Sequence, residues 1–160
     1  MKILSLDQAL QTTGYCIWEN DKPVKWGTFK TTNTFPIDKR LRQIWTQLDA
    51  FLEAYNDFDL IAFEDCQQQQ NAQTYHKLSM VKAIILLWCN INNKIYMVYA
   101  PSSWRNLCGG GYGRKREEQK QVAINNVKKW YDIDADSDVC DAINIGRAAL
   151  IDLGRNKSAF

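Results

Sequence analysis

The sequence predicts an α/β domain in which helices pack against the faces of one sheet. Three strand-like segments come first, and then a helix, a strand, a helix, a strand and further helices follow in order. The first of these segments, Ile3–Leu6, is continuously apolar, as a strand buried on both faces would be. A chain of 160 residues is long enough for one core and too short for two. We therefore expect a single domain over residues 1–160.

The composition is that of a soluble globular protein, with 46% hydrophobic and 24% charged residues. The net charge is only +2, so any surface for nucleic acid must come from local clustering of cations. The longest apolar run, Ala83–Cys89, is too short to span a bilayer, and no signal peptide is apparent. We expect no membrane partner.

The cysteines argue for a reducing compartment. There are five of them, an odd number, and no two form a CxxC pair. This pattern is typical of reduced thiols in a cytoplasmic protein rather than of a disulfide frame or a zinc site.

The first three segments predict a meander. Ile3–Leu6 ends in a carboxylate, Asp7, and a polar turn leads into a second strand, Tyr15–Glu19. The cluster Asn20–Pro23 predicts a turn, after which Val24–Lys30 returns as a third strand.

A long helix and a fourth strand come next. Pro36 suits a first helical turn, and apolar residues then recur at three- and four-residue spacing to Tyr55, which predicts an amphipathic helix that covers the sheet. The strand Leu60–Phe63 also ends in an acid, Glu64.

The following helix, Tyr75–Trp88, is apolar over much of its circumference and needs cover on two sides. That cover is either another helix of the same chain or a second copy of the chain. We favour the second copy, which would form a homodimer with a two-fold interface on this helix. The preceding residues, Gln67–Gln70, read as a loop or as the frayed start of the helix. A fifth strand is expected at Ile95–Tyr99.

The rest of the chain predicts helices and one glycine-rich loop. Pro101–Trp104 opens a short helix with serines available for capping. The loop Cys108–Gly113 and a basic triplet precede a helix of about four turns that runs to Trp130. The last helix is expected to begin near Asp138.

Four acids stand out as candidates for chemistry: Asp7, Glu64, Asp138 and Asp141. The first two end candidate strands, and the last two share one face at the start of a helix. Asp138 and Asp141 could instead cap that helix, because a helix N-terminus stabilises carboxylates. Oxygen ligands favour Mg²⁺ or Mn²⁺, and two such ions about 4 Å apart can promote phosphodiester hydrolysis.

The acids lie within motifs that resemble the RuvC family of Holliday-junction resolvases, in the ribonuclease H-like superfamily. The matching segments are Leu4–Asp7 with Thr13–Tyr15, Ile61–Glu64, Lys120–Val122 and Asp138–Ala142. They follow the order and spacing of the family over nearly the whole chain. The resemblance implies a mixed five-stranded ribonuclease H-like sheet, two Mg²⁺ ions (or Mn²⁺) on the four acids, and a homodimer that makes paired symmetric nicks in four-way DNA junctions.

Three positions depart from the family pattern. Gln8-Ala9 stands where Pro-Gly is common, which alters the turn but keeps the acid. Gln67–Gln70 occupy a loop where the family often has an aromatic residue that probes the junction centre, so Gln68 and Gln69 are candidate DNA contacts. The lysine that faces the active site in the family has two candidates here, Lys120 and Lys115.

The glycine-rich loop and the basic triplet after it are the expected DNA surface. Arg114, Lys115 and Arg116 would meet phosphates, and Tyr112 would stack on an unpaired base. The alternative is an ordinary solvated loop. Trp104-Arg105 would flank the same groove, although a tryptophan is more often a core residue.

Two other polar residues have simple interpretations. Lys82 is interpreted as a solvated charge or a charge at the rim of a dimer interface. His76, the only histidine, is expected at the surface, because metal ions make a catalytic base unnecessary.

Three other functions compete with a junction resolvase. An actin-like ATP-binding fold also begins with a strand, an Asp and a turn, but it needs glycine-rich phosphate loops and a longer chain. A non-catalytic binder of branched DNA would have no need of four acids that face phosphates. A fork or flap endonuclease is the closest competitor, because the departures lie in the loop that would probe the junction.

Overall fold

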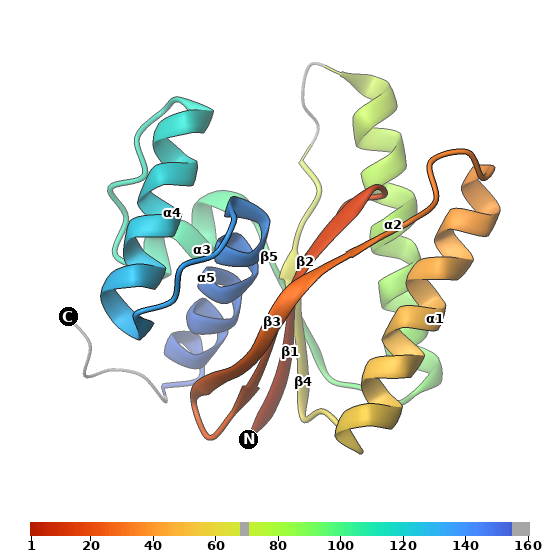
Figure 1. The fold of residues 1–160 in the computed structure, drawn as a ribbon, viewed down its shortest axis with the longest axis horizontal. Coiled ribbons are helices and arrows are strands. Elements are labelled where there is room, and N and C mark those ends of the chain that lie inside the picture. The colour runs from red at the N-terminus through yellow and green to blue at the C-terminus, as the bar shows by residue number, and fades with distance from the viewer. Residues whose placement is uncertain (68–70, 155–160) are drawn as a thin grey trace.

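The computed structural model describes residues 1–67 and 71–154, and in it a five-stranded sheet lies between two layers of helices (Figure 1). The strands are β1 (Lys2–Asp7), β2 (Thr12–Glu19), β3 (Lys22–Lys30), β4 (Leu60–Glu64) and β5 (Tyr96–Tyr99). Their order across the sheet is β3-β2-β1-β4-β5. The central strand β1 pairs in parallel with β4 and antiparallel with β2, so the prediction of a mixed five-stranded sheet is confirmed.

The hairpin between β2 and β3 is tighter than expected. Only Asn20 and Asp21 form its turn, with φ angles of 50° and 66° that asparagine and aspartate tolerate better than most residues. Lys22 and Pro23 already belong to β3. A proline is acceptable there because β3 is an edge strand of the sheet, where a missing N–H leaves no neighbour unpaired.

Of the five helices in the described parts of the chain, two cover one face of the sheet and the other three cover the opposite face (Figure 1). The first pair are α1 (Ile37–Tyr55) and α2 (Ala72–Ile91). The other three are α3 (Pro101–Leu107), α4 (Arg116–Tyr131) and α5 (Ser137–Asp152). Each helix that the sequence predicts is present, with boundaries within a few residues of those expected.

The helix caps differ from one expectation. The serines of α3 do not cap it, because the N-cap residue is Ala100 and no side chain makes a capping hydrogen bond. Pro101 occupies the first helical position, where its missing N–H has no intrahelical acceptor in any case. In α2 the N-cap is Asn71, whose side chain accepts hydrogen bonds from the backbone of the first turn.

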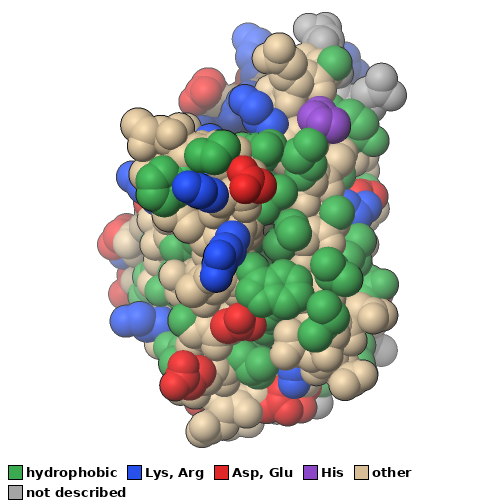
Figure 2. Space-filling view, turned by 90° about the vertical axis from the view of Figure 1, so that its right-hand side faces the viewer, with side chains coloured by type: hydrophobic (Ala, Val, Ile, Leu, Met, Phe, Trp, Pro, Cys, Tyr) green, Lys and Arg blue, Asp and Glu red, His purple; other side chains and the backbone are tan. Residues whose placement is uncertain are grey.

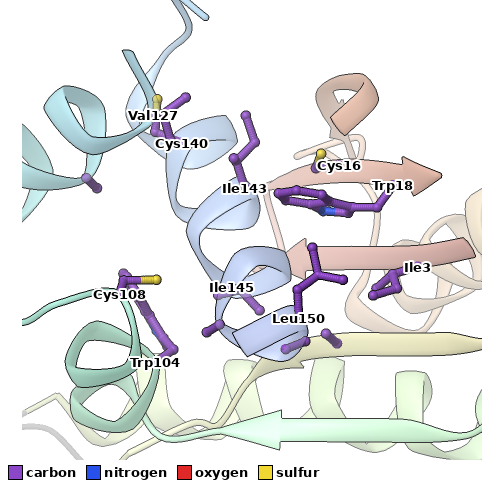
Figure 3. Close-up of a cluster of buried hydrophobic side chains, with 14 of the residues drawn as sticks. Ile3, Cys16, Trp18, Trp104, Cys108, Val127, Cys140, Ile143, Ile145 and Leu150 are labelled. Carbon is purple, nitrogen blue, oxygen red and sulfur yellow. The ribbon is translucent and has the colours of Figure 1, made fainter. Parts of the chain in front are cut away.

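Alternation along β1 separates two hydrophobic cores. Leu4 and Leu6 point into the core under α1 and α2, whereas Ile3 lies in the core under α5. Figure 3 shows the second core, in which Trp18 from β2 lies against Ile143 of α5. Residues 3, 5 and 7 of β1 therefore face α5.

Two glycines allow α5 to lie unusually close to the sheet. A Cβ on Gly14 would lie 2.1 Å from the Asp138 carbonyl oxygen, and a Cβ on Gly146 would lie 2.1 Å from Trp18 Nε1. Both distances are far below van der Waals contact. Glycine is therefore required at these two positions, and the start of α5 is held directly beside β2.

Candidate active site

The two strand-end acids emerge side by side on the face that α5 covers. In the parallel pairing of β1 with β4, Leu6 is opposite Phe63, so Asp7 and Glu64 follow on neighbouring strands. Ala62 lies in the α5 core, and Glu64, two residues further on, points to the same face. The register of the sheet alone thus brings these two carboxylates together.

The first turn of α5 supplies the other two acids. Asp138 and Asp141 lie one turn apart, and both act electrostatically on Asp7. The helix cap is a different residue, because Asp136 is the N-cap and its Oδ1 accepts a hydrogen bond from the Val139 N–H at 3.0 Å. The reading of Asp138 and Asp141 as simple helix caps is therefore wrong, and both carboxylates remain available for chemistry.

The side chain of Gln8 ties the ends of β1 and β4 together. Its Nε2 donates to the carbonyl oxygen of Glu64, and its Oε1 accepts from the Glu64 N–H at 3.2 Å. Gln8 is 6% exposed, so water competes little for these bonds. Gln8 therefore holds the backbone of Glu64 next to Asp7. The sequence indicated only that the turn after Asp7 was altered.

Two residues of α3 complete the surroundings of the acids. Trp104 is buried and donates its indole N–H to Glu64 Oε1 at 2.8 Å. The Arg105 guanidinium lies 4.8 Å from the centre of the Trp104 ring. Its positive charge partly opposes the rise in pKa that burial causes at Asp7, Glu64 and Asp141. Its Nε is buried without a hydrogen-bond partner among the described residues. The sequence placed this pair only at the flank of the groove.

The crowding of acids changes their proton affinity. Burial raises the pKa of Asp7 well above its usual range, and the charges of Asp141, Glu64 and Asp138 raise it further. Burial and the charge of Glu64 raise the pKa of Asp141 to about 7. Burial also raises the pKa of Glu64, while the Trp104 hydrogen bond opposes that rise. A cluster that resists full ionisation in this way is typical of a site for cations.

The donor chemistry fits a hard divalent cation. All four ligand candidates are carboxylates, which suit Mg²⁺ or Mn²⁺. Across residues 1–67 and 71–154, no three Asp, Glu, His or Cys side chains are arranged so that they could enclose one ion. Mg²⁺ does not need such a cage, because proteins commonly hold it through one or two carboxylates with water and substrate phosphate.

Of the two candidate lysines, Lys120 is the one that acts on the acids. It lies on α4, and its charge lowers the pKa of Asp141. Lys115 is the N-cap residue of α4, with an exposed side chain. Arg114 and Arg116 flank it and are also exposed, so the basic triplet is open to a ligand.

The structure corrects the role expected for Tyr112. Its side chain is only 4% exposed, its hydroxyl donates to Asn144 Oδ1 at 2.7 Å, and its ring packs edge-on against Trp104. A ring enclosed in this way is not accessible to an unpaired base. Tyr112 instead anchors the glycine-rich loop to α5.

Three further expectations concern α2 and the loop before it, and a fourth concerns membrane-spanning helices. Gln68 and Gln69 lie outside the described residues. His76 is exposed, as predicted. Lys82 pairs with Asp65, so it is not simply a solvated charge. No helix within the described parts of the chain is both long and apolar enough to cross a membrane.

Comparison with known proteins agrees with this geometry. Residues 3–148 match the family model described as crossover junction endodeoxyribonuclease RuvC. A protein of that name from Caldicellulosiruptor saccharolyticus is 25% identical over 156 residues, which cover 94% of this chain and 93% of that protein. The one from Dictyoglomus thermophilum is 27% identical over 147 residues, which cover 89% and 92%.

Solved structures share the fold. The Thermus thermophilus RuvC structure superposes with a TM-score of 0.76 at 14% identity and covers 97% of this chain and 98% of its own. The same organism's RuvC in complex with a Holliday junction substrate gives 0.75 at 14% identity, with 97% of both chains covered. The yeast mitochondrial Holliday junction resolvase Ydc2 gives 0.61 at 14% identity, with 96% and 81% covered.

Proposed function

The chain belongs to the RuvC family of crossover junction endodeoxyribonucleases, and on that premise we propose that it resolves four-way DNA junctions by paired, symmetric hydrolysis of phosphodiester bonds. The observation that carries this proposal is the convergence of four carboxylates from β1, β4 and α5 at one end of the sheet. Their sequence positions span most of the chain, and the fold alone unites them. A protein that only bound DNA would gain nothing from this concentration of negative charge.

RuvC nucleases are metal-dependent, and Asp7, Glu64, Asp138 and Asp141 are the residues that we expect to hold the metal here. We infer two Mg²⁺ ions for each site, with Mn²⁺ as a substitute. Such ions activate a water molecule and stabilise the leaving oxygen of the broken phosphodiester. No histidine is needed as a base, which fits the exposed position of His76.

The protein's own residues orient the acids and receive the DNA. Gln8 holds the backbone of Glu64 by two hydrogen bonds, and Trp104 holds the Glu64 carboxylate by one. Arg105 offsets part of the negative charge of the cluster, which would otherwise repel the phosphate that must enter. Lys120, beside Asp141, adds a cation on the α4 side. The exposed triplet Arg114–Arg116 is placed to hold phosphates further out.

Paired nicks require two sites, and we propose that α2 forms the interface of a homodimer. Its residues Val81, Ile85, Trp88 and Cys89 are buried inside the chain. Leu87 and Ile91 nevertheless remain 51% and 58% exposed, and Ile95 beyond the helix is 70% exposed. Figure 2 shows hydrophobic side chains that form a band down this side of the molecule. A two-fold contact on this band would cover it and would set two acid clusters symmetrically about a junction.

The substrate partner is branched DNA, and we place the protein in the cytoplasm. Its five cysteines are free thiols, as the reducing compartment requires.

One cleavage experiment tests the function. A synthetic four-way junction, a replication fork, a flap and a linear duplex are each incubated with the protein in Mg²⁺ and, as the control, in EDTA. We expect symmetric paired nicks in the junction in Mg²⁺ and none in EDTA. Faster cleavage of the fork or flap would identify a broader branched-DNA endonuclease. Binding of the junction without any cleavage in Mg²⁺ or Mn²⁺ would show a non-catalytic binder.

A further inference from the structure

A second cationic feature lies away from the acids, in a cleft between the end of β3 and one side of α1. The cleft has a volume of about 510 Å³. Lys30 lines it from β3, Phe35 from the segment that joins the two elements, and Lys39, Arg42, Thr46 and Gln47 from one face of α1. Phe35 is 44% exposed, and the Lys39 ammonium lies 5.8 Å from the centre of its ring.

The cations of the cleft form no ion pairs within residues 1–67 and 71–154. Lys30, Lys39 and Arg42 are all exposed. No acidic side chain is among the described residues that line the cleft. Asp49 of α1 faces elsewhere, because its carboxylate accepts the indole N–H of Trp88 at 2.7 Å. Three unpaired cations around one hollow attract a polyanion.

The wall of the cleft is held in place before any ligand arrives. The Gln43 side chain bonds twice to Thr32, accepting from its N–H at 2.8 Å and donating to its hydroxyl at 2.9 Å. Arg40 donates to Thr31 Oγ1 at 2.9 Å and to Asn33 Oδ1 at 3.2 Å. This neighbouring arginine therefore has a structural role, in contrast to Arg42. A fixed wall reduces the entropy that binding must overcome.

The cleft lies near the end of the strands at which the acids also lie, but it is beside α1, whereas the acids are on the face that α5 covers. Asp7 pairs with Gly14, and Gly14 pairs with Thr28, so Lys30 lies two residues beyond this row on the second strand from β1. With strands about 4.8 Å apart and a rise of about 3.3 Å per residue, the Cα atoms of Lys30 and Asp7 are about 12 Å apart. The two features are therefore close enough for one duplex arm of several base pairs to reach both.

We propose that this cleft binds the sugar-phosphate backbone of one duplex arm of the substrate, outside the nucleotides at the cleaved phosphate. The inference rests on the proposed function for the identity of the DNA, and the cleft itself is separate from the acids and from the Arg114–Arg116 triplet. In this arrangement Lys30, Lys39 and Arg42 contact phosphates. The ring of Phe35 holds the Lys39 ammonium by a cation–π contact. The cleft thereby fixes the direction in which an arm leaves the active site.

A matched pair of variants tests the proposal. The cleft variant carries Lys30→Ala, Lys39→Ala and Arg42→Ala, and the control carries Lys22→Ala, Lys25→Ala and Lys129→Ala, which remove the same charge from exposed sites elsewhere. Binding of a labelled four-way junction is measured by fluorescence anisotropy in EDTA over a salt series. We expect the slope of log K against log salt to fall by about 2 to 3 for the cleft variant. The control should keep the wild-type slope.

The position of the contact is tested with neutral methylphosphonates placed along one duplex arm, outside the nucleotides at the nick. They should weaken binding of the wild-type protein severalfold and have little further effect on the cleft variant. Equal weakening of both proteins, or an unchanged slope in the cleft variant, would overturn the proposal. Cleavage by the unaltered chain reports separately on the proposed function, because binding is measured without metal. Thermal unfolding of both variants confirms that the fold is intact.

Discussion

Gln8 and Glu64 are joined through both backbone polar groups of Glu64, the N–H at 3.2 Å and the carbonyl oxygen. These two hydrogen bonds extend the pairing of β1 with β4 beyond Leu6 and Phe63, the last residues that the strands pair. Because Gln8 directly follows Asp7, this side chain sets the spacing between two of the four acids. In this chain the side-chain amide of Gln8 thus aligns the two acids that end β1 and β4.

Replacing Gln8 with methionine should therefore slow catalysis. Gln8→Met keeps the length of the side chain but leaves two backbone groups of Glu64 unpaired, at a cost of roughly 1–3 kcal/mol in the free energy of unfolding. We expect turnover to fall by about 10- to 100-fold, as for other residues that orient metal ligands. Gln11→Met, at an exposed position, is the control. Single-turnover cleavage at normal rate in a destabilised Gln8→Met protein would show that Gln8 supports only the fold.

The four acids should be individually essential for cleavage but not for binding. Asp7→Asn, Glu64→Gln, Asp138→Asn and Asp141→Asn each remove a metal ligand and also reduce repulsion of the phosphates. We expect strand cleavage to fall by at least about 1,000-fold, while junction affinity stays equal or rises. Asp38→Asn, at an exposed acid of α1, should behave as wild type. Near-normal turnover in any two of the four variants would refute the four-acid site.

Without metal, the protein should lose stability as the pH rises from about 4 to about 7. The folded-state pKa of Asp141 is about 7, above its value in the unfolded chain, so the folded state binds the extra proton in this range. Stability therefore falls with rising pH, by an amount on the order of 1–3 kcal/mol.

Urea unfolding in EDTA measures this effect, with Asp141→Asn as the comparison. The variant should show a flatter dependence on pH, and Mg²⁺ should stabilise the wild type more at pH 8 than at pH 5, because the ligands are then ionised. A wild-type curve parallel to that of Asp141→Asn would contradict the raised pKa.

The basic triplet should contribute affinity for DNA of every shape. The substitutions Arg114→Ala, Lys115→Ala and Arg116→Ala remove exposed cations, and each lost phosphate contact should lower the slope of log K against log salt by about 0.7–0.9. Junction, fork and duplex should weaken alike, since all of them present phosphates to these exposed cations. Filter binding at several salt concentrations measures the slopes. Unchanged slopes would reduce the segment to ordinary surface.

A charge on the exposed side of α2 should separate the dimer. Leu87 is 51% exposed within one chain, so Leu87→Glu leaves the internal core intact and places a carboxylate in the proposed interface. We expect a folded monomer by light scattering, which nicks junctions singly and without a coordinated second cut. Val24→Glu, at a similarly exposed apolar residue on β3, should remain dimeric. A wild-type chain that is monomeric with and without junction DNA would rule out the interface.

The sequence predicted the fold well because its local signals agree with the tertiary arrangement. The apolar runs, the spacing in α1 and the turn residues each point to the element that forms, and a run that ends in Asp7 or Glu64 also marks where a strand ends. The four acids could be singled out for the same reason. Their mutual proximity depends on sheet order and on α5, which periodicity does not encode.

Other features depended on contacts between distant segments and could not be predicted. An aspartate at a helix start is ambiguous by type, and only the hydrogen bond of Asp136 shows that it, and not Asp138, is the cap. Tyr112 lies next to a basic triplet in sequence, yet its hydroxyl reaches Asn144, 32 residues away. Arg105 was expected only at the flank of the groove, because its nearness to the acids follows from the packing of α3 against α5.

The close approach of α5 to β2 at Gly14 also means that the acid cluster is complete only after a segment far along the chain has docked. Asp7 leaves the ribosome early, but it gains its partners from α5 only after residues 137–152 have emerged and docked. Before α5 docks, the sheet holds only Asp7 and Glu64 of the four acids, and one face of the sheet is uncovered. A chain that lacks α5 therefore has two of the four acids and cannot assemble the site.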